Sequence, residues 1–140
     1  MMGKTIILHC SDSAWGDAAI IDEWHKERGF NKIGYHKVIL NGCRKSSHDY
    51  DKKIDGMVED GRELNEIGAH CYGHNDAIGI CLIGKSATFT DEQIVACFYE
   101  LKALKKIFKE IEVYQHSDFD KKKSFCAGFT KSQMEQFNKV

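Results

Sequence analysis

Runs of apolar residues bounded by glycines or polar residues predict the strands of one sheet. Residues 5–10 (TIILHC) are β-branched and alternate little, which is typical of a buried strand. Residues 33–40 (IGYHKVIL) predict a second strand. Residues 78–84 (IGICLIG), bounded by glycines, suit the centre of a sheet. Residues 110–117 (EIEVYQHS) predict the last strand, so strands recur along the whole chain.

The stretch between the second and the central strand is polar and rich in turn-forming residues. Residues 41–56 (NGCRKSSHDYDKKIDG) predict either a long surface loop or an extended hairpin. Residues 57–62 (MVEDGR) predict a short strand and a turn. Residues 65–77 (NEIGAHCYGHNDA) predict a loop rich in glycine and histidine.

Helical periodicity predicts a first helix within residues 11–30. Three polar residues at its start can cap it: Ser11, Asp12 and Ser13. Ile20, Ile21 and Trp24 share one helical face, and Gly29 ends the helix.

Two further helices have capping signals. Thr90 and Gln93 form a capping box for the second helix. Its apolar positions recur at helical spacing: Ile94, Cys97, Phe98, Leu101, Leu104 and Phe108. Thr130 caps a short terminal helix. Together the elements predict an α/β protein, with a central mixed β-sheet flanked by helices in a single domain over residues 1–140.

Composition and charge narrow the class of protein. The chain has 140 residues, which suits one domain with a real core. The net charge of -1 gives no electrostatic case for nucleic acid and no polybasic face for membranes. Because no apolar run approaches about 20 residues, we expect no membrane insertion. The start, MMGKTIILHC, predicts a first strand rather than a secretion signal.

The six cysteines are expected to be reduced thiols, because no export signal accompanies them. Cys81 and Cys97 lie inside apolar runs and are interpreted as small core residues.

Three other residues have the chemistry of zinc ligands. His9 and His116 stand at the C-terminal ends of the first and last strands, and Cys126 follows ten residues after His116. Strand ends are where open sheets place functional groups, and zinc binds imidazole nitrogen and thiolate sulfur. Cys10 points away from His9, into the core. Spacing alone favours a hydrogen-bonded strand-end histidine at His9 and a buried thiol at Cys126 over metal ligands.

A family resemblance adds to this pattern. In order along the chain stand IILHCSDS, IIDEWHKERGFNKIGYHKVI, DGMVEDGRELNEIGAHCYGHNDAIGICLIG, FTDEQ and HSDF…KSFCAGF. This order resembles the zinc-dependent N-acetylmuramoyl-L-alanine amidases, above all the bacteriophage lysozyme-type members, which share the fold of peptidoglycan recognition proteins. The resemblance covers almost the whole chain. It implies a Zn²⁺ enzyme, an endolysin, that hydrolyses the amide between N-acetylmuramic acid and L-alanine of the stem peptide.

The resemblance also assigns roles to single residues. It implies metal ligation by His9, His116 and Cys126, and it matches Tyr35 to the family's catalytic tyrosine. A catalytic lysine usually stands two residues before the metal cysteine, where this chain has Ser124. We assign that role to Lys123, with Lys122 as the alternative.

The expected substrate contacts are less specific. His70 and Asn75 lie in the loop that we expect to wall the groove, and Arg62 can pair with a stem-peptide carboxylate. Each has a structural alternative: His70 can have a purely structural role, Asn75 can hydrogen-bond its own loop, and Arg62 can be a solvated turn residue. His25 and His48 are interpreted as surface histidines. His36 is left out of the site because it should face away from it.

One departure from the family pattern is an insertion at residues 43–53. It forms either a lip over the substrate groove or a harmless long hairpin.

Three alternatives to a phage enzyme remain open at this point: a non-catalytic peptidoglycan-binding module of the same fold, a cytosolic muropeptide-recycling amidase, and a protein with a structural zinc. The presence of Cys126 favours the enzyme. We expect a monomer that acts on peptidoglycan, made in the host cytoplasm without a signal peptide and released through a separate pore protein.

Overall fold

A five-stranded sheet organises residues 3–140, which are the residues that the structure, a computed structural model, describes. The strands are β1 (Lys4–Cys10), β2 (Lys37–Cys43), β3 (Tyr50–Asp60), β4 (Ile78–Leu82) and β5 (Ile111–Gln115). Their order across the sheet is β3-β2-β4-β1-β5. Strands β2, β4, β1 and β5 run parallel, and β3 pairs antiparallel with β2. The predicted mixed sheet is confirmed.

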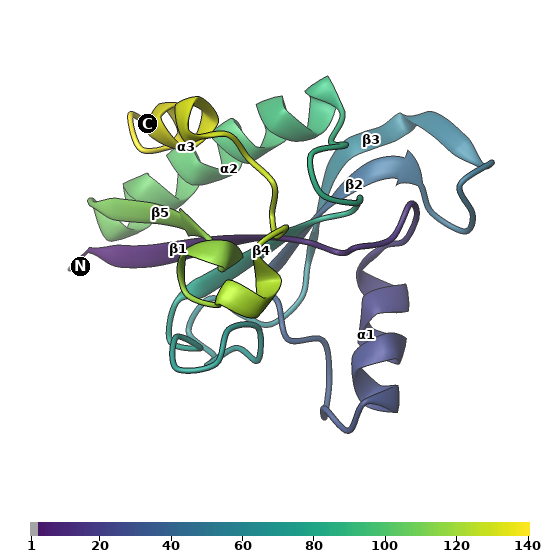
Figure 1. Ribbon diagram of the computed structural model, residues 1–140, viewed down its shortest axis with the longest axis horizontal. Helices are drawn as coiled ribbons and strands as arrows, with labels where there is room; N and C mark the ends of the chain where they lie inside the picture. The colour runs from purple at the N-terminus through teal and green to yellow at the C-terminus, as the bar shows by residue number, and fades with distance from the viewer. Residues whose placement is uncertain (1–2) are drawn as a thin grey trace.

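Helices cover both faces of this sheet. They are α1 (Ala18–Glu27), α2 (Asp91–Phe108) and α3 (Lys131–Phe137). Figure 1 shows α2 and α3 on one side of the sheet and α1 on the other. The α/β architecture predicted from the sequence is therefore confirmed. Among residues 3–140, no helix combines the length and the apolar composition that crossing a bilayer requires.

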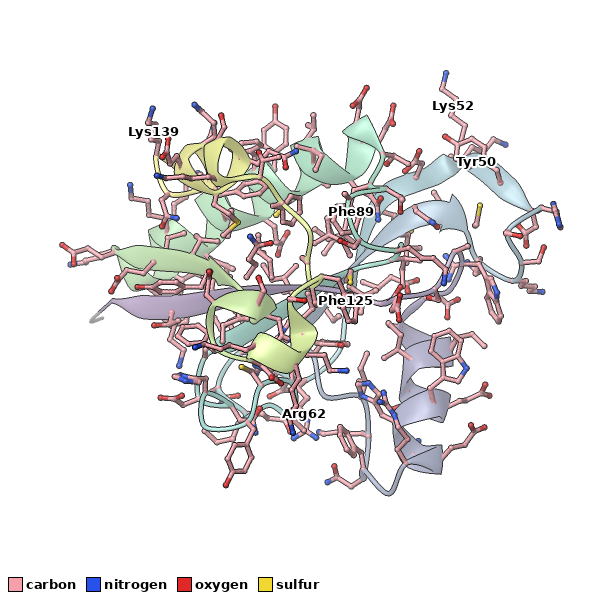
Figure 2. All side chains as sticks on the ribbon, viewed as in Figure 1. Tyr50, Lys52, Arg62, Phe89, Phe125 and Lys139 are labelled. Atoms are coloured by element: carbon pink, nitrogen blue, oxygen red, sulfur yellow. The ribbon has the colours of Figure 1, made fainter. Side chains whose placement is uncertain are left out.

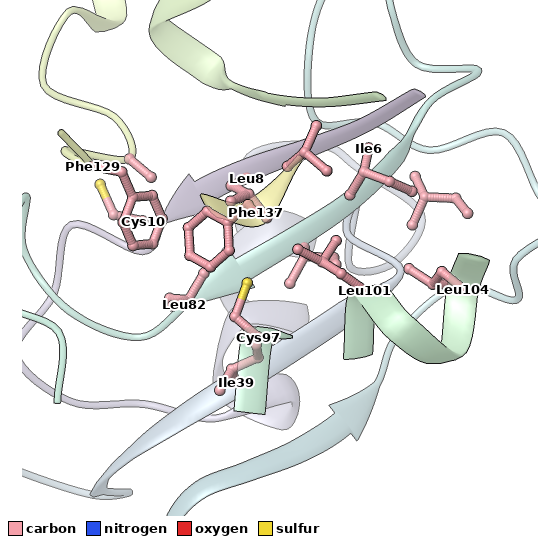
Figure 3. Close-up of a cluster of buried hydrophobic side chains, with 14 of the residues drawn as sticks. Ile6, Leu8, Cys10, Ile39, Leu82, Cys97, Leu101, Leu104, Phe129 and Phe137 are labelled. Carbon is pink, nitrogen blue, oxygen red and sulfur yellow. The ribbon is translucent and has the colours of Figure 1, made fainter. Parts of the chain in front are cut away.

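The side chains of β1 alternate between the two faces, as successive strand residues must. Ile6, Leu8 and Cys10 pack into the main core with α2 and α3 (Figure 3). His9 faces the other way, where its ring meets that of His70. The prediction that Cys10 turns into the core while His9 turns away is confirmed. Cys81 and Cys97 are both fully buried, as expected of small core residues.

The helix boundaries follow their caps. Thr90 and Thr130 cap α2 and α3 as predicted, and each does so in a capping box, which the sequence analysis expected only at Thr90. The predicted cap of the first helix is wrong: Asp17, not a residue of 11–13, accepts a hydrogen bond from the Ile20 N–H at 2.9 Å. The helix starts later because residues 11–16 first form the turn that leaves β1. Gly29, with φ +95°, follows the helix end as predicted.

The polar stretch 41–56 is an extended hairpin, one of the two predicted forms. Its far strand, β3, extends through Asp60 and takes in most of the short strand expected at 57–62. The near strand, β2, begins at Lys37, so Tyr35 and His36 precede it. Arg44, in the insertion, binds the carboxylates of Asp17 and Glu59 at 2.6 and 3.0 Å. The insertion is thereby tied to the start of α1, and none of its residues lines the main cleft.

Candidate active site

The ends of β1 and β5 bring together the three predicted metal ligands. These strands pair in parallel with Leu8 opposite Gln115, so His9 and His116 leave the sheet side by side. Their ring centroids are 4.6 Å apart. Cys126 completes the group, and the ligand atoms of the three residues all lie within 4.8 Å of one another. His9 is far from the other two along the chain, so the parallel pairing of β1 with β5 is what allows the three to meet.

Two short 3₁₀ turns carry the chain from His116 back to Cys126: η1 (His116–Asp118) and η2 (Lys121–Lys123). The Gln115 side chain holds the returning segment. Its Nε2 donates to the Phe129 carbonyl at 3.0 Å, and its Oε1 accepts from the N–H groups of Gly128 and Phe129. The Ser117 N–H donates to the Cys126 carbonyl at 2.7 Å. Cys126 is therefore positioned by backbone contacts on both sides.

The donor groups of this cluster suit a divalent cation. Burial lowers the pKa of His9 and of His116, so both rings are neutral at pH 7 and can offer a lone pair. The neighbouring Cys10 thiol and burial raise the pKa of Cys126, while the Cys10 N–H donates to its Sγ at 3.1 Å. A cation beside Sγ would reverse that balance and favour the thiolate. Two neutral imidazoles and one cysteine sulfur are a ligand set that zinc accepts, with one position left for solvent.

A cleft of about 500 Å³ opens over the cluster, and Tyr35 lines it. The Tyr35 ring centroid is 4.9 Å from that of His9. Burial raises the pKa of the phenol well above its ordinary value, so Tyr35 stays protonated and is a hydrogen-bond donor at pH 7.

Lys123 lines the same cleft, whereas Lys122 does not. Its Nζ lies 5.9 Å from the centroid of the Phe125 ring, close enough for a cation–π contact. Figure 2 shows Phe125 near the middle of the molecule, far from the hairpin residues Tyr50 and Lys52. Between the two candidate lysines, the geometry favours Lys123.

His70 borders the cleft but offers no free ring nitrogen to a substrate. Its Nδ1 lies 2.9 Å from Nε2 of His9, and its Nε2 lies 2.9 Å from the Ala77 carbonyl oxygen. The residue is only 9% exposed. Both ring nitrogens are therefore engaged inside the protein, and substrate contact by His70 stays a prediction.

Arg62 is also held by hydrogen bonds inside the protein. Its Nε and Nη1 donate to the carbonyls of Ile33 and Ile67 at 2.8 Å, and Nη2 reaches Asn31 Oδ1 at 3.3 Å. Arg62 does not line the cleft, and Figure 2 places it among the loops beside α1. Its guanidinium joins these loops to one another, and binding of a substrate carboxylate by Arg62 stays a prediction.

Asn75 takes the structural alternative that the sequence left open and keeps a place at the cleft. Its Oδ1 accepts from the N–H groups of His70 and Cys71 at 2.7 and 2.8 Å. Its side chain also lines the cleft, so the amide nitrogen remains a candidate for substrate contact.

His25 is the residue at this site that the sequence analysis missed. The sequence suggests a surface residue, yet His25 is 4% exposed and lines the cleft with its ring 5.4 Å from that of Tyr35. Its Nδ1 accepts the Gly34 N–H at 2.9 Å, which fixes the segment that carries Tyr35. The missed signal was its place four residues after the buried Ile21, on the same helical face. His48, in contrast, is exposed as predicted.

The buried His25 predicts an acid-sensitive fold. Burial, with Arg28 and Arg62 nearby, lowers the pKa of His25 from 6.5 to about 4. Between pH 6.5 and pH 4 the imidazole of His25 is protonated in the unfolded state but not in the folded state. The free energy of unfolding therefore falls as the pH falls through this range, and the loss is complete below pH 4. The full effect is about 3 kcal/mol. In His25→Asn, which keeps an acceptor for Gly34, denaturant unfolding across this window should show a shallower loss of stability.

His48→Asn is the matched control for that measurement, because His48 is exposed. An unchanged pH dependence in His25→Asn, equal to that of His48→Asn, would contradict the assignment of this acid sensitivity to His25.

The fold and the site together define a class: an α/β protein with a His–His–Cys cluster in a cleft, of the amidase and peptidoglycan recognition protein fold. N-acetylmuramoyl-L-alanine amidase LysC from Clostridium intestinale URNW superposes with a TM-score of 0.77 at 24% identity, over 99% of this chain and 86% of LysC. A peptidoglycan recognition protein ectodomain also superposes, from the complex of proteins LCa and LCx with bound tracheal cytotoxin. Its TM-score is 0.65 at 22% identity, over 84% of this chain and 72% of that one.

Sequence comparison identifies the family. The endolysin of Klebsiella phage KP32 is 32% identical over 124 residues, which are 81% of this chain and 74% of that protein. The chain belongs to the family of phage endolysins, and the resemblance to bacteriophage amidases is confirmed. No protein-family model matches the chain.

Proposed function

We propose that this endolysin is a zinc-dependent hydrolase that cleaves the amide between N-acetylmuramic acid and L-alanine of the peptidoglycan stem peptide. The observation that carries the proposal is the convergence of His9, His116 and Cys126 beneath a cleft that Tyr35 and Lys123 also line. The alternative of a structural zinc is less well supported. Among residues 3–140 no fourth histidine, cysteine or carboxylate joins this group, and structural zinc sites usually have four ligands.

His9, His116 and Cys126 would hold the ion. When bound there, zinc supplies Lewis acidity, which polarises the scissile carbonyl and makes a water nucleophilic near neutral pH. The thiolate of Cys126 would keep the backbone hydrogen bond from Cys10, and the two imidazoles would stay neutral.

The protein's own groups act around the scissile amide. The protonated Tyr35 phenol can donate a hydrogen bond to the developing oxyanion or move a proton to the departing amine. The Lys123 ammonium stands at the wall of the cleft, where it stabilises negative charge on the tetrahedral intermediate. His25 holds the Tyr35 segment in place through the Gly34 N–H.

The rest of the cleft suits a muropeptide, a muramyl sugar that carries its stem peptide. Exposed aromatic rings stand at its rim: Phe30, Tyr72 and Phe125. Such rings can pack on the apolar face of a sugar, and Arg28 lines the cleft where a stem carboxylate could pair with it. Asn75 completes the proposed contacts. The binding of tracheal cytotoxin by the peptidoglycan recognition proteins LCa and LCx, which share the fold, agrees with a ligand of this class.

The test is to incubate the purified protein with muropeptides and identify the products by mass spectrometry. We expect the free stem peptide and the intact muramyl sugar, and we expect a strong chelator to stop their release until zinc is restored. Cleavage of a sugar–sugar or peptide–peptide bond instead, or full turnover after verified removal of metal, would contradict the proposal.

Lys123 and Lys122 form a matched pair for testing the second catalytic group. We expect Lys123→Ala to lower kcat by about 100-fold, because one charge-stabilising donor in an active site contributes about that much. Lys122→Ala should stay within about twofold of the parent, since its side chain lies outside the cleft. The measurement is steady-state muropeptide turnover with zinc content verified. Equal losses in both variants, or a loss only in Lys122→Ala, would contradict the assignment.

We further propose that the catalytic domain spans residues 1–140, that it acts as a monomer, and that it reaches the wall from the host cytoplasm through a separate pore protein. Membership of the phage endolysins supports the last point. Sedimentation of the purified protein at the expected single-chain mass, 16.0 kDa, would agree with a monomer.

A further inference from the structure

A chain of hydrogen bonds ends at one of the proposed metal ligands. The Ala77 carbonyl oxygen only accepts hydrogen bonds, so the His70 Nε2 that lies 2.9 Å from it must carry a proton. In a neutral ring, His70 Nδ1 is then an acceptor. It lies 2.9 Å from His9 Nε2, so that nitrogen must be the donor. The remaining nitrogen of His9, Nδ1, is left with a bare lone pair.

The ring of His70 occupies a space that two glycines leave open. A Cβ atom at Gly79, in the middle of the fully buried β4, would lie 2.6 Å from Cγ of His70. A Cβ atom at Gly68 would lie 2.5 Å from its Cδ2. Both contacts are far closer than real Cβ atoms allow. On the third side, Asn75 holds the backbone N–H of His70 at 2.7 Å. The surroundings therefore fix the position of the ring.

We propose that His70 is a positioning residue that holds His9 in the Nε2–H tautomer and so aims the Nδ1 lone pair of His9 at the cluster with His116 and Cys126. The expected effect on metal affinity rests on the proposed function. The tautomer of His9 does not, because it is a property of the metal-free protein. Hydrogen-bond partners that fix the tautomer and orientation of a metal-binding histidine contribute about 10- to 100-fold in metal affinity.

The direct test is nuclear magnetic resonance of the metal-free protein. Long-range ¹H–¹⁵N correlation of the histidine rings distinguishes a protonated from a bare ring nitrogen, and a His9→Asn sample assigns the His9 signals. We expect Nε2 of His9 to be protonated and Nδ1 to be bare. An Nδ1–H tautomer of His9 in the unsubstituted protein would overturn the proposal, whatever the enzyme does with zinc.

Two substitutions of His70 distinguish loss of its hydrogen-bond acceptor from loss of its ring volume. His70→Phe keeps a ring but has no acceptor, so we expect a mixed His9 tautomer and zinc affinity reduced about 10- to 100-fold in chelator competition. His70→Asn places Oδ1 near the position of Nδ1, and we expect it to restore the tautomer and most of the affinity. Equal zinc affinity in His70→Phe and the parent would overturn the proposal while leaving the proposed function standing.

His36→Asn is the control for a purely structural effect. His36 is also buried and also engages backbone groups through both nitrogens, Glu66 O at 2.8 Å and Gly79 N at 3.0 Å, but it has no hydrogen bond to His9. We expect it to lower the melting temperature without changing the His9 tautomer. If zinc affinity falls in proportion to melting temperature across all three variants, His70 has no positioning role. If the parent binds no zinc, the proposed function fails, and the tautomer measurement still decides this inference.

Discussion

Replacing Cys126 by serine is expected to lower muropeptide turnover by about 1,000-fold or more. Cys126 is the one sulfur donor in the cluster, and a serine hydroxyl does not ionise near neutral pH to replace a thiolate. Loss of Lewis-acid stabilisation worth several kcal/mol corresponds to this factor, since about 1.4 kcal/mol is tenfold in rate. Cys126→Ser should also lose stoichiometric zinc, which elemental analysis of the purified protein measures.

Cys43→Ser provides the comparison for this variant. Cys43 is also a buried free thiol, but it lies in the hairpin and does not line the cleft. We expect it to keep zinc and turnover close to those of the parent. If Cys126→Ser folds, retains zinc and turns over substrate at the parent rate, the metal assignment is wrong. Circular dichroism and a melting curve for each variant establish that any loss of turnover is not a loss of folding.

The second large effect is expected from Tyr35→Phe, which should lower kcat by about 100- to 1,000-fold while leaving zinc bound. The phenol is the group at the cleft that can donate a proton beside the metal cluster, and positioned proton donors contribute about this factor. Phenylalanine keeps the packing of the ring against His9 and His25, so binding of zinc and the melting temperature should change little.

Tyr114→Phe tests whether that loss is specific. Tyr114 lies on β5, and its hydroxyl donates to Glu112 at 2.8 Å, away from the cleft. We expect parent-like turnover from this variant. A Tyr35→Phe enzyme with full kcat would remove Tyr35 from the chemistry and leave it a packing role. A raised KM with unchanged kcat would indicate that the hydroxyl only binds substrate.

Much of the fold follows from short-range patterns in the sequence. The strand 78–84, the capping box at Thr90 and the cap at Thr130 were predicted well, because apolar runs and caps act within a few residues. The cap of the first helix was predicted wrongly, since several polar residues precede it and only the tertiary structure selects one. The cap is Asp17, whose carboxylate accepts a hydrogen bond from Arg44, 27 positions further along the chain.

For the site, too, some features followed from the sequence and others only from the tertiary structure. His9, His116 and Cys126 lie close together, as the strand ends and the family resemblance led us to expect, and metal binding by them stays a prediction. His25 was misjudged as a surface residue, and the contacts of His70 and Arg62 were not foreseen, because residue type does not reveal which hydrogen-bond partners surround a side chain. Arg62 is engaged by the Ile33 and Ile67 carbonyls, and His70 by His9 and Ala77. Several of those partners come from distant segments.

By itself the sequence determined most of the strands and helices, their apolar faces, and that two histidines and a cysteine stand at positions where chemistry is possible. Periodicity and capping are local, so a linear chain carries them. Only the tertiary structure decided that β5 pairs beside β1, that Gln115 holds the segment that follows Cys126, and that His70 lies within hydrogen-bonding distance of His9. These contacts depend on packing between residues far apart in the chain, which no local pattern records.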